Sequence, residues 1–137
     1  RRRRSRRRRI ARSRRSRRGS HVIRRGEIRE VDLEPVLGSE ADKRRPAIIV
    51  SNDAANATAS RLGRGVVTVV PVTSNVAFIY PFQARLPGAA TGLPRDSKAQ
   101  AEQVRSVAVE RIGERLGVVP RSLMDQVDEA LRLHLSL

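Results

Sequence analysis

The sequence predicts a small, mostly β domain, in which a curved barrel of five to seven short, mainly antiparallel strands precedes one C-terminal α-helix. Short runs rich in valine and isoleucine occur along the chain, as at 47–50 and 66–72, and β-branched residues favour strands. Glycine and proline separate these runs at close intervals, which is typical of antiparallel connections rather than βαβ units. A long stretch with helical periodicity follows only after Pro120.

Charge divides the chain into two parts. Of the 137 residues, 29 are Lys or Arg and 14 are Asp or Glu, and the net charge is +15. Thirteen arginines lie within residues 1–18, which contain no acid, so the rest of the chain carries only +2. We therefore expect a disordered Arg-rich arm over 1–21 and one folded domain over 22–137. Because residues 18–21 read Arg-Gly-Ser-His, the scar of a cleavable expression tag is favoured over a native nucleic-acid-binding arm.

Composition excludes several kinds of chemistry. There is no cysteine, which excludes disulfides, thiolate zinc sites and a cysteine nucleophile. The chain has two histidines, one of them in the tag-like segment, which argues against a two-histidine ribonuclease and a Ser-His-Asp hydrolase. No P-loop, GxGxxG or HExxH motif is present. We expect any catalysis to proceed without a metal or cofactor, through Arg, Thr, Ser, Glu or water.

No targeting or membrane segment is evident in the sequence. No apolar run approaches the roughly 18–20 residues of a membrane span, and the arginine tract lacks the apolar region of a secretory signal. The cytoplasm is therefore the expected compartment, with no membrane partner.

The first half of the domain predicts two strands and a short helix. The first strand is expected over 23–33, with Gly26 at a bend and Glu34-Pro35 at its end. A polar loop over 36–44 is interpreted as a solvated connection in preference to a mobile lid. Pro46 opens the second strand, and residues 51–53 can cap a helix over 54–59.

The second half predicts further short strands. The valine-rich stretch 66–72 is the third strand and 83–86 alternates as another; residues 97–109 are expected to form two short strands or one bent strand. All three aromatic residues lie within 78–82. They form either a stacking platform for bases or, as we favour from the sequence, a core pair of Phe78 and Phe82 with only Tyr80 partly exposed.

The last element is predicted to be an amphipathic helix from Pro120 to about Leu135. Its expected apolar face combines Leu123, Val127, Ala130, Leu131 and His134, with Met124 and Leu135 beside it. The histidine is assigned to packing or capping rather than to catalysis.

Two strand ends carry side chains suited to phosphate. Arg44 and Arg45 run into the second strand, and Thr73 and Ser74 follow the third. An arginine fork donates two hydrogen bonds to phosphate and stays charged, and a hydroxyl beside it can donate to a phosphoryl oxygen. From these residues alone, an enzyme and a nucleic-acid-binding module both remain open.

Taken in chain order, a series of motifs resembles the MazF/PemK (Kid) family of toxin endoribonucleases. The motifs are Arg25-Gly26-Glu27-Ile28, Val31-Asp32-Leu33-Glu34-Pro35, Gly38-Ser39-Glu40, Arg44-Arg45-Pro46-Ala47-Ile48-Ile49-Val50-Ser51-Asn52, Asn56, Val70-Pro71-Val72-Thr73-Ser74, Tyr80-Pro81-Phe82 and Gln103-Val104-Arg105-Ser106, followed by the C-terminal helix. The resemblance spans about residues 24–137. Its Arg-Pro and Pro-x-Thr pieces point to the ribonuclease branch rather than to the gyrase-poisoning relatives of the same fold.

The resemblance implies an SH3-like barrel of the CcdB/MazF/Kid type that forms a homodimer. It implies metal-independent, sequence-specific cleavage of single-stranded RNA by 2′-OH attack, which inhibits translation and growth, and neutralisation by a cognate MazE-like antitoxin. The alternatives are a non-catalytic nucleic-acid-binding module and a gyrase-inhibiting toxin of the same fold.

Site residues are carried over from the family's motifs. The implied catalytic residues are Arg45 as phosphate stabiliser and candidate proton donor, Thr73 beside the scissile phosphate, and Glu102. An arginine–aspartate proton-transfer pair found in some members is not reproduced, because Gln100 stands at the arginine position. The implied RNA-binding residues are Ser39, Asn56, Ser74, Tyr80, Gln103 and Arg105.

Overall fold

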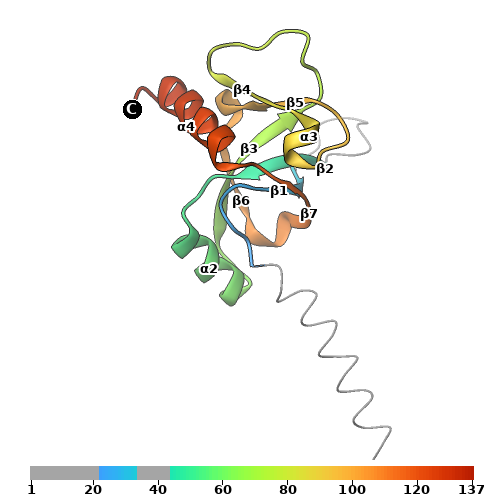
Figure 1. Cartoon of the computed structure of the whole chain (residues 1–137). Helices are drawn as coiled ribbons and strands as arrows, with labels where there is room; N and C mark the ends of the chain where they lie inside the picture. Colours follow the sequence, from blue (N-terminus) through green and yellow to red (C-terminus); the bar gives the residue numbers. More distant parts are fainter. Residues whose placement is uncertain (1–21, 34–43) are drawn as a thin grey trace, which may run out of the picture.

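The structure, a computed structural model, describes residues 22–33 and 44–137. Within these ranges seven strands form one antiparallel sheet (Figure 1). The strands are β1 (Glu27–Asp32), β2 (Arg44–Ile49), β3 (Val66–Thr73), β4 (Gln83–Leu86), β5 (Ser97–Gln100), β6 (Arg105–Ala108) and β7 (Ile112–Val118). The helices are α2 (Asp53–Leu62), α3 (Gly88–Thr91) and α4 (Arg121–Leu135), with 3₁₀ turns η1 (Ala101–Gln103) and η2 (Val109–Arg111).

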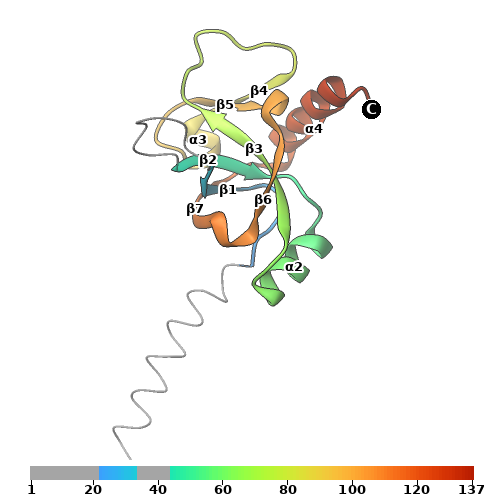
Figure 2. The same cartoon turned by 180° about the vertical axis from the view of Figure 1, so that it is seen from behind.

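The strand order is β4-β5-β3-β2-β1-β7, and β6 pairs with β3. β3 is shared between two partners on one edge, because Val66–Val69 pair with β6 whereas Val72 and Thr73 pair with β5. Seen from behind, β6 runs beside the lower part of β3 (Figure 2). The predicted fold class, mostly β with a C-terminal helix, is confirmed; the strand ladder of the described residues remains open rather than closing into a full barrel.

Gly26 forms the sharp entry into β1. Its φ of +93° lies in a region that side chains with a Cβ rarely adopt. The Gly26 N–H donates to the Ile49 carbonyl at 2.8 Å, and the Gly26 carbonyl accepts from the Val119 N–H at 2.8 Å. The expected bend is therefore confirmed, and it joins the start of β1 to the end of β2 and to the chain after β7.

Helix α2 begins and ends at the predicted kinds of residue. The Asn52 side chain accepts a hydrogen bond from the Ala55 N–H at 2.8 Å, as an N-cap should. Gly63 ends the helix in the left-handed conformation. The helix predicted over 54–59 extends to Leu62, because the chain leaves the helical conformation only at this glycine.

Residues 97–109 form two strands separated by a 3₁₀ turn, β5, η1 and β6, which is one of the two predicted forms. β5 pairs with the end of β3 and β6 with its beginning. The interruption at η1 lets the chain move from one end of β3 to the other. The stretch 87–94 contains the single helical turn α3.

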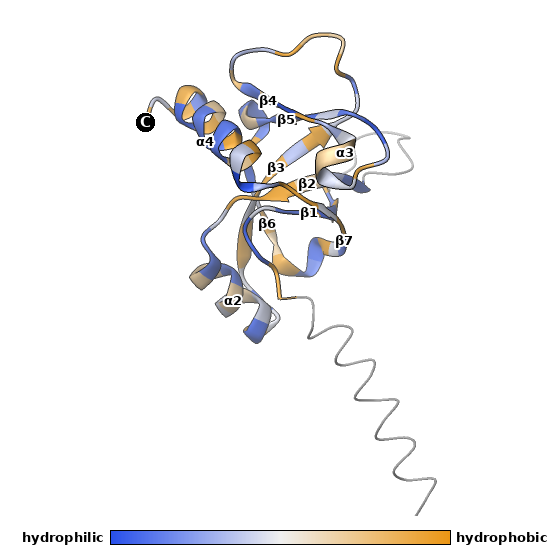
Figure 3. Cartoon of the chain, in the orientation of Figure 1, coloured by the Kyte–Doolittle hydropathy of each residue, from blue (hydrophilic) through white to orange (hydrophobic). Residues whose placement is uncertain are grey.

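Helix α4 packs on β4 and η1 and covers one of two hydrophobic clusters. Its buried residues are Met124, Val127 and Ala130. Apolar and polar residues alternate in stripes along it (Figure 3). His134 and Leu135 are exposed, so the prediction that His134 packs on the apolar face is wrong. The covered face is centred on Met124 and Val127, and it does not extend to the last turn.

Two predicted segments, the arm 1–21 and most of the polar loop 36–44 with Ser39, lie outside the described residues. Within the ranges that are described, no helix combines the length and apolarity needed to cross a membrane.

Candidate active site

A cavity of about 350 Å³ lies where β2 begins and β3 ends. Arg45 comes from the start of β2, Thr73 from the last position of β3, and Arg95 from the segment before β5. The full lining is Arg45, Pro46, Val72, Thr73, Ser74, Leu93, Pro94, Arg95 and Ser97. The structure thus brings together the two strand ends whose side chains suit a phosphate.

The strand register explains why Arg45 and Thr73 meet. The antiparallel ladder of β2 and β3 places Ala47 opposite Pro71. Continued by two residues, this register places Arg45 opposite Thr73, and side chains directly opposite one another share a face of the sheet. A one-residue slip would send one of the two to the other face.

Both charged side chains in the described lining of the cavity are arginines. Arg45 and Arg95 are both exposed, and within residues 22–33 and 44–137 no carboxylate lines the cavity. Sequence reasoning missed Arg95, which stands in a turn-rich stretch with no motif to mark it. Two guanidinium groups without a lining acid favour an anionic ligand, and arginine matches the geometry of phosphate.

The Thr73 hydroxyl is positioned by the turn that follows β3. Its Oγ1 accepts a hydrogen bond from the Asn75 N–H at 3.2 Å, and the Asn75 side chain accepts one from the Ala77 N–H at 3.4 Å. An oxygen that accepts from a backbone N–H still carries its own proton. The Thr73 O–H is therefore able to donate to a ligand oxygen, and the exposed Ser74 lines the cavity beside it.

Glu102, predicted as a catalytic residue, does not line this cavity. It lies in η1, where its Oε1 accepts a hydrogen bond from Gln83 Nε2 at 2.8 Å. Its Oε2 is buried and has no hydrogen-bond partner in the described part of the chain. The structure gives Glu102 a link to the start of β4, and its catalytic role stays a prediction.

Asn56, predicted to bind RNA, is fully buried. Its Nδ2 donates to the Ser51 carbonyl at 2.8 Å, and its Oδ1 accepts from the Ser51 hydroxyl at 2.5 Å. The Ser51 Oγ in turn accepts from the Thr68 N–H at 3.1 Å. Asn56 therefore ties the N-terminal turn of α2 to β3, and the structure offers no exposed surface of this residue to a ligand.

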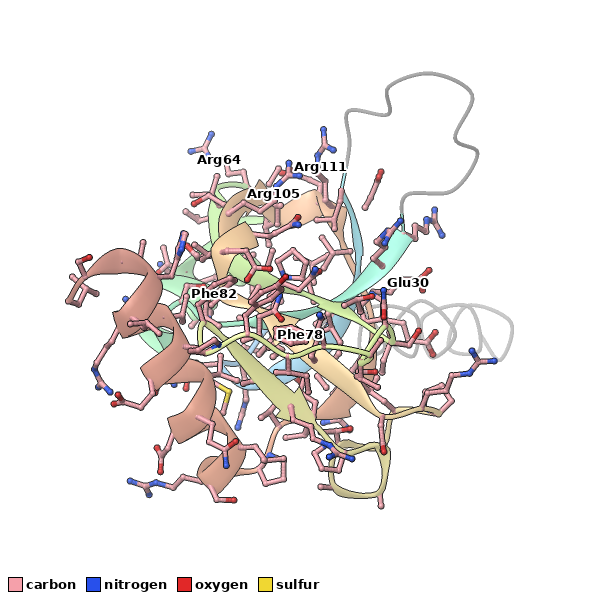
Figure 4. All side chains as sticks on the ribbon, turned by 90° about the horizontal axis from the view of Figure 1, so that it is seen from above. Glu30, Arg64, Phe78, Phe82, Arg105 and Arg111 are labelled. Carbon is pink, nitrogen blue, oxygen red and sulfur yellow. The ribbon has the colours of Figure 1, made fainter. Side chains whose placement is uncertain are left out.

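The other predicted RNA-binding residues lie at different places. Gln103 and Arg105 are exposed at η1 and at the start of β6, and Arg105 stands opposite Val69 in β3. Seen from above, Arg105, Arg64 and Arg111 point toward the same side of the molecule, apart from Phe78 (Figure 4). Ser39 is outside the described residues.

The aromatic residues are not a core pair. Phe78 and Tyr80 are 62% and 48% exposed, and Phe82 is half-buried. The favoured expectation that Phe78 and Phe82 are core is wrong, because the loop between β3 and β4 arches away from the sheet (Figure 1).

Metal-binding side chains do not gather at this site. Across residues 22–33 and 44–137, no three His, Asp or Glu side chains form a group that could hold a metal ion.

An antiparallel sheet with an arginine- and hydroxyl-bearing cavity at the end of its central strand defines a small protein suited to a phosphate-containing ligand. Comparison with known proteins makes the class specific. The family model described as "PemK-like, MazF-like toxin of type II toxin-antitoxin system" matches residues 24–135. The chain therefore belongs to the PemK-like, MazF-like toxin family of type II toxin–antitoxin systems.

Individual relatives agree with this assignment. Endoribonuclease MazF9 of Mycobacterium tuberculosis is 61% identical over 116 residues, covering 85% of this chain and 98% of that protein. Endoribonuclease EndoA of Bacillus subtilis is 29% identical over 116 residues, covering 85% and 97%. The structure is similar to MazF of Deinococcus radiodurans, with a TM-score of 0.65 and 28% identity over 85% of this chain and 98% of that one.

A MazE–MazF structure from Deinococcus radiodurans aligns equally well, with a TM-score of 0.65 and 28% identity over 85% and 98%. The family predicted from the sequence is confirmed, and the predicted enzyme class agrees with the names of these relatives. The non-catalytic module and the gyrase inhibitor are not favoured by them.

Proposed function

We propose that this chain is the toxin of a toxin–antitoxin pair and cleaves single-stranded RNA at a specific short sequence, without a metal ion. The observation that carries the proposal is the cavity shared by Arg45 and Thr73, in which the described polar lining consists of two arginines and three hydroxyl residues, with no acid among the described residues. The names of its relatives as endoribonucleases support the choice of RNA as the substrate.

The chemistry needs no co-reactant. The 2′-oxygen of the RNA forms a bond to the adjacent phosphorus while the bond from phosphorus to the 5′-oxygen breaks. The proton lost by the 2′-hydroxyl is balanced by the one that the 5′-oxygen takes up. The products are a 2′,3′-cyclic phosphate, which water can open to a 3′-phosphate, and a 5′-hydroxyl end.

The residues of the cavity suit this step. Negative charge grows on the phosphoryl oxygens as the 2′-oxygen approaches, and the fixed guanidinium of Arg45 stabilises it. The Thr73 O–H donates to one of these oxygens. Ser74 and Arg95 contact the neighbouring part of the RNA backbone, and Tyr80, Gln103 and Arg105 are the further RNA contacts. Because Asn56 is buried, we leave it out of this set.

The proposal includes partners. We propose that the chain acts as a homodimer in the cytoplasm and is neutralised by a cognate MazE-like antitoxin. The MazE–MazF structure with a similar fold supports an antitoxin of this kind.

The test is cleavage of one long single-stranded RNA in the presence of EDTA, followed by mapping of the new 5′ ends. We expect cuts at one recurring short sequence, with ends that a polynucleotide kinase labels without prior phosphatase treatment. A requirement for added metal, or 5′-phosphate ends, would contradict the mechanism. Absence of any cleavage would contradict the proposed function itself.

A further inference from the structure

The loop between β3 and β4 presents three aromatic rings in a row. The ring centroids of Phe78 and Tyr80 are 4.6 Å apart with planes at 60°, and those of Tyr80 and Phe82 are 5.2 Å apart with planes at 4°. Tyr80 is therefore stacked on Phe82, and Phe78 meets Tyr80 edge to face. Exposure falls along the row, from Phe78 at 62% and Tyr80 at 48% to the half-buried Phe82. Neighbouring exposed apolar side chains often mark the surface where a protein binds a partner.

Lys98, on strand β5, fixes one end of this loop to the sheet. Its register partner in the sheet is Thr73, so it stands on β5 directly beside the last residue of β3. Lys98 is only 8% exposed, and its Nζ donates to the Phe78 carbonyl at 2.7 Å. No carboxylate forms an ion pair with it among the residues that the structure describes. Burying an ammonium group without a carboxylate is unfavourable. A buried lysine at this position therefore points to a role other than packing.

Gln83 holds the other end of the loop. The Tyr80 N–H donates to Gln83 Oε1 at 3.1 Å, and the Gln83 N–H donates to the Tyr80 carbonyl at 2.9 Å. Gln83 Nε2 then donates to the Glu102 carboxylate at 2.8 Å. The rings are thus attached to the sheet on both sides, at Phe78 through Lys98 and at Tyr80 through Gln83.

We propose that Phe78 and Tyr80 form a stacking platform for RNA bases next to the scissile phosphate, with Phe82 supporting Tyr80, and that Lys98 is the positioning residue that fixes the platform beside Thr73. The inference rests on the proposed function and specifies how that site holds its substrate. It assigns the half-buried Glu102 to the support of this platform through Gln83.

The surroundings favour RNA over a protein partner. Lys98 links the rings to the cavity, because it pairs with the lining residue Thr73 and its Nζ donates to the Phe78 carbonyl at 2.7 Å. Cations for the backbone next to aromatic faces for the bases are the combination that binds single-stranded nucleic acids without sequence preference. On this proposal one RNA strand runs from the cavity to the rings, along a single track.

Acidic residues near the β4 end of the loop disfavour RNA on that side of the rings. The hollow beyond it is lined by Pro81, Gln83, Asp125, Gln126, Glu129, Ala130 and Leu133. Asp125 and Glu129 would repel RNA phosphates. Bases are thus expected on Phe78 and Tyr80, which lie toward the cavity and are the more exposed rings, and not beyond Phe82.

A binding test follows from composition, because Tyr80 is the only tyrosine and the chain has no tryptophan. Intrinsic fluorescence therefore reports on this one ring. The probe is a short mixed-sequence RNA that is 2′-O-methylated throughout, so that it cannot be cleaved, and the control is inorganic polyphosphate, which has the charge but no bases.

We expect saturable quenching by the RNA and none by polyphosphate, after correction for absorbance. Quenching by both, or by neither while the RNA binds, would overturn the platform. Fluorescence that changes with protein concentration alone, and not with RNA, would show that another copy of the chain covers the rings.

A kinetic test addresses Lys98. We expect Lys98→Met and Phe78→Leu each to raise KM about ten-fold, the order expected when one stacked base is lost, with kcat within a few-fold of the wild type. Lys98→Arg, which keeps a donor, should restore most of KM. The matched control is Arg85→Met, since Arg85 is the exposed register neighbour of Lys98 on β4 and forms an ion pair with Asp96 at 3.5 Å rather than a bond to the aromatic loop.

The double variant separates positioning from a general loss of structure. If Lys98 acts through the rings, Lys98→Met combined with Phe78→Leu should be no worse in KM than either single variant. Additive losses, or an unchanged KM in variants whose melting temperature is that of the wild type, would overturn the role of Lys98.

The two proposals fail differently. A wild-type chain that cleaves no RNA would contradict the proposed function. The fluorescence titration would still show whether RNA bases stack on the aromatic rings. A chain that cleaves RNA normally after loss of Phe78 or Lys98 would contradict the platform alone.

Discussion

Arg45 and Thr73 line one cavity because the β2–β3 register, read from Ala47 opposite Pro71, continues to place them face to face. Arg45 is the second residue of β2, and Thr73 is the last residue of β3. An antiparallel pair brings the start of one strand to the end of the next. This relationship is the basis of the predictions on catalysis.

Arg45→Ala should lower the rate of single-turnover RNA cleavage by about 100-fold or more, the cost of removing one donor to a developing negative charge. Arg45→Lys should recover only part of this loss, because an ammonium lacks the planar fork. The neighbouring Arg44→Ala serves as the control, since Arg44 lines a different cavity, with Glu30 and Asp32. Equal losses in the Arg44 and Arg45 variants would contradict a specific role for Arg45.

Thr73→Val keeps the shape of the side chain and removes its hydroxyl. We expect a loss of about 100-fold in the cleavage rate, and substantial recovery in Thr73→Ser, measured on the same RNA. Thr58→Val on the exposed face of α2 is the matched control, because its hydroxyl donates to the Ala54 carbonyl of its own helix at 3.0 Å. A Thr73→Val variant as active as the wild type would show that the hydroxyl takes no part.

Asn56→Ala should act on stability. It removes two hydrogen bonds to the half-buried Ser51 and the side chain of a fully buried residue, so the free energy of unfolding should fall by about 2–4 kcal/mol. Urea unfolding followed by circular dichroism measures this. Asn52→Ala, which removes an exposed helix cap, should cost only about 1 kcal/mol. A stable Asn56→Ala variant with weakened RNA binding would instead support the direct contact implied by the family resemblance.

The charge of residues 1–21 should appear in the salt dependence of RNA binding. A chain that begins at Val22 lacks thirteen arginines, so it should bind RNA more weakly at low salt and with a smaller slope of log affinity against log salt. Equilibrium titrations of both chains over a salt series measure the difference. Identical slopes would show that the arm does not contact RNA.

Local sequence patterns were sufficient for most of the elements. The valine-rich run 66–72 became β3, and Asn52 and Gly63 cap α2, because β-branched runs, caps and left-handed glycines act over a few residues. The periodicity after Pro120 gave α4 for the same reason. Which face of α4 is covered was predicted only in part, since His134 fits the period but extends beyond the surface of β4 and η1.

The candidate site was predicted from the sequence only in part. Motifs named Arg45 and Thr73, but the same motifs named Asn56, which is buried, and Glu102, which lies under the aromatic loop rather than in the cavity. Arg95 and Lys98 had no motif at all. Their positions follow from the pairing of β5 with β3, which joins segments far apart in the chain.

The sequence by itself determined the kinds of elements, the family and the chemistry available, because these depend on side-chain type and on patterns within a few residues. The tertiary structure alone decided that Arg45 faces Thr73, that Lys98 is buried beside it, and that Phe78 and Tyr80 are exposed. The physical reason is that burial and proximity depend on which strand pairs with which and in what register, and that pairing is a property of the whole sheet.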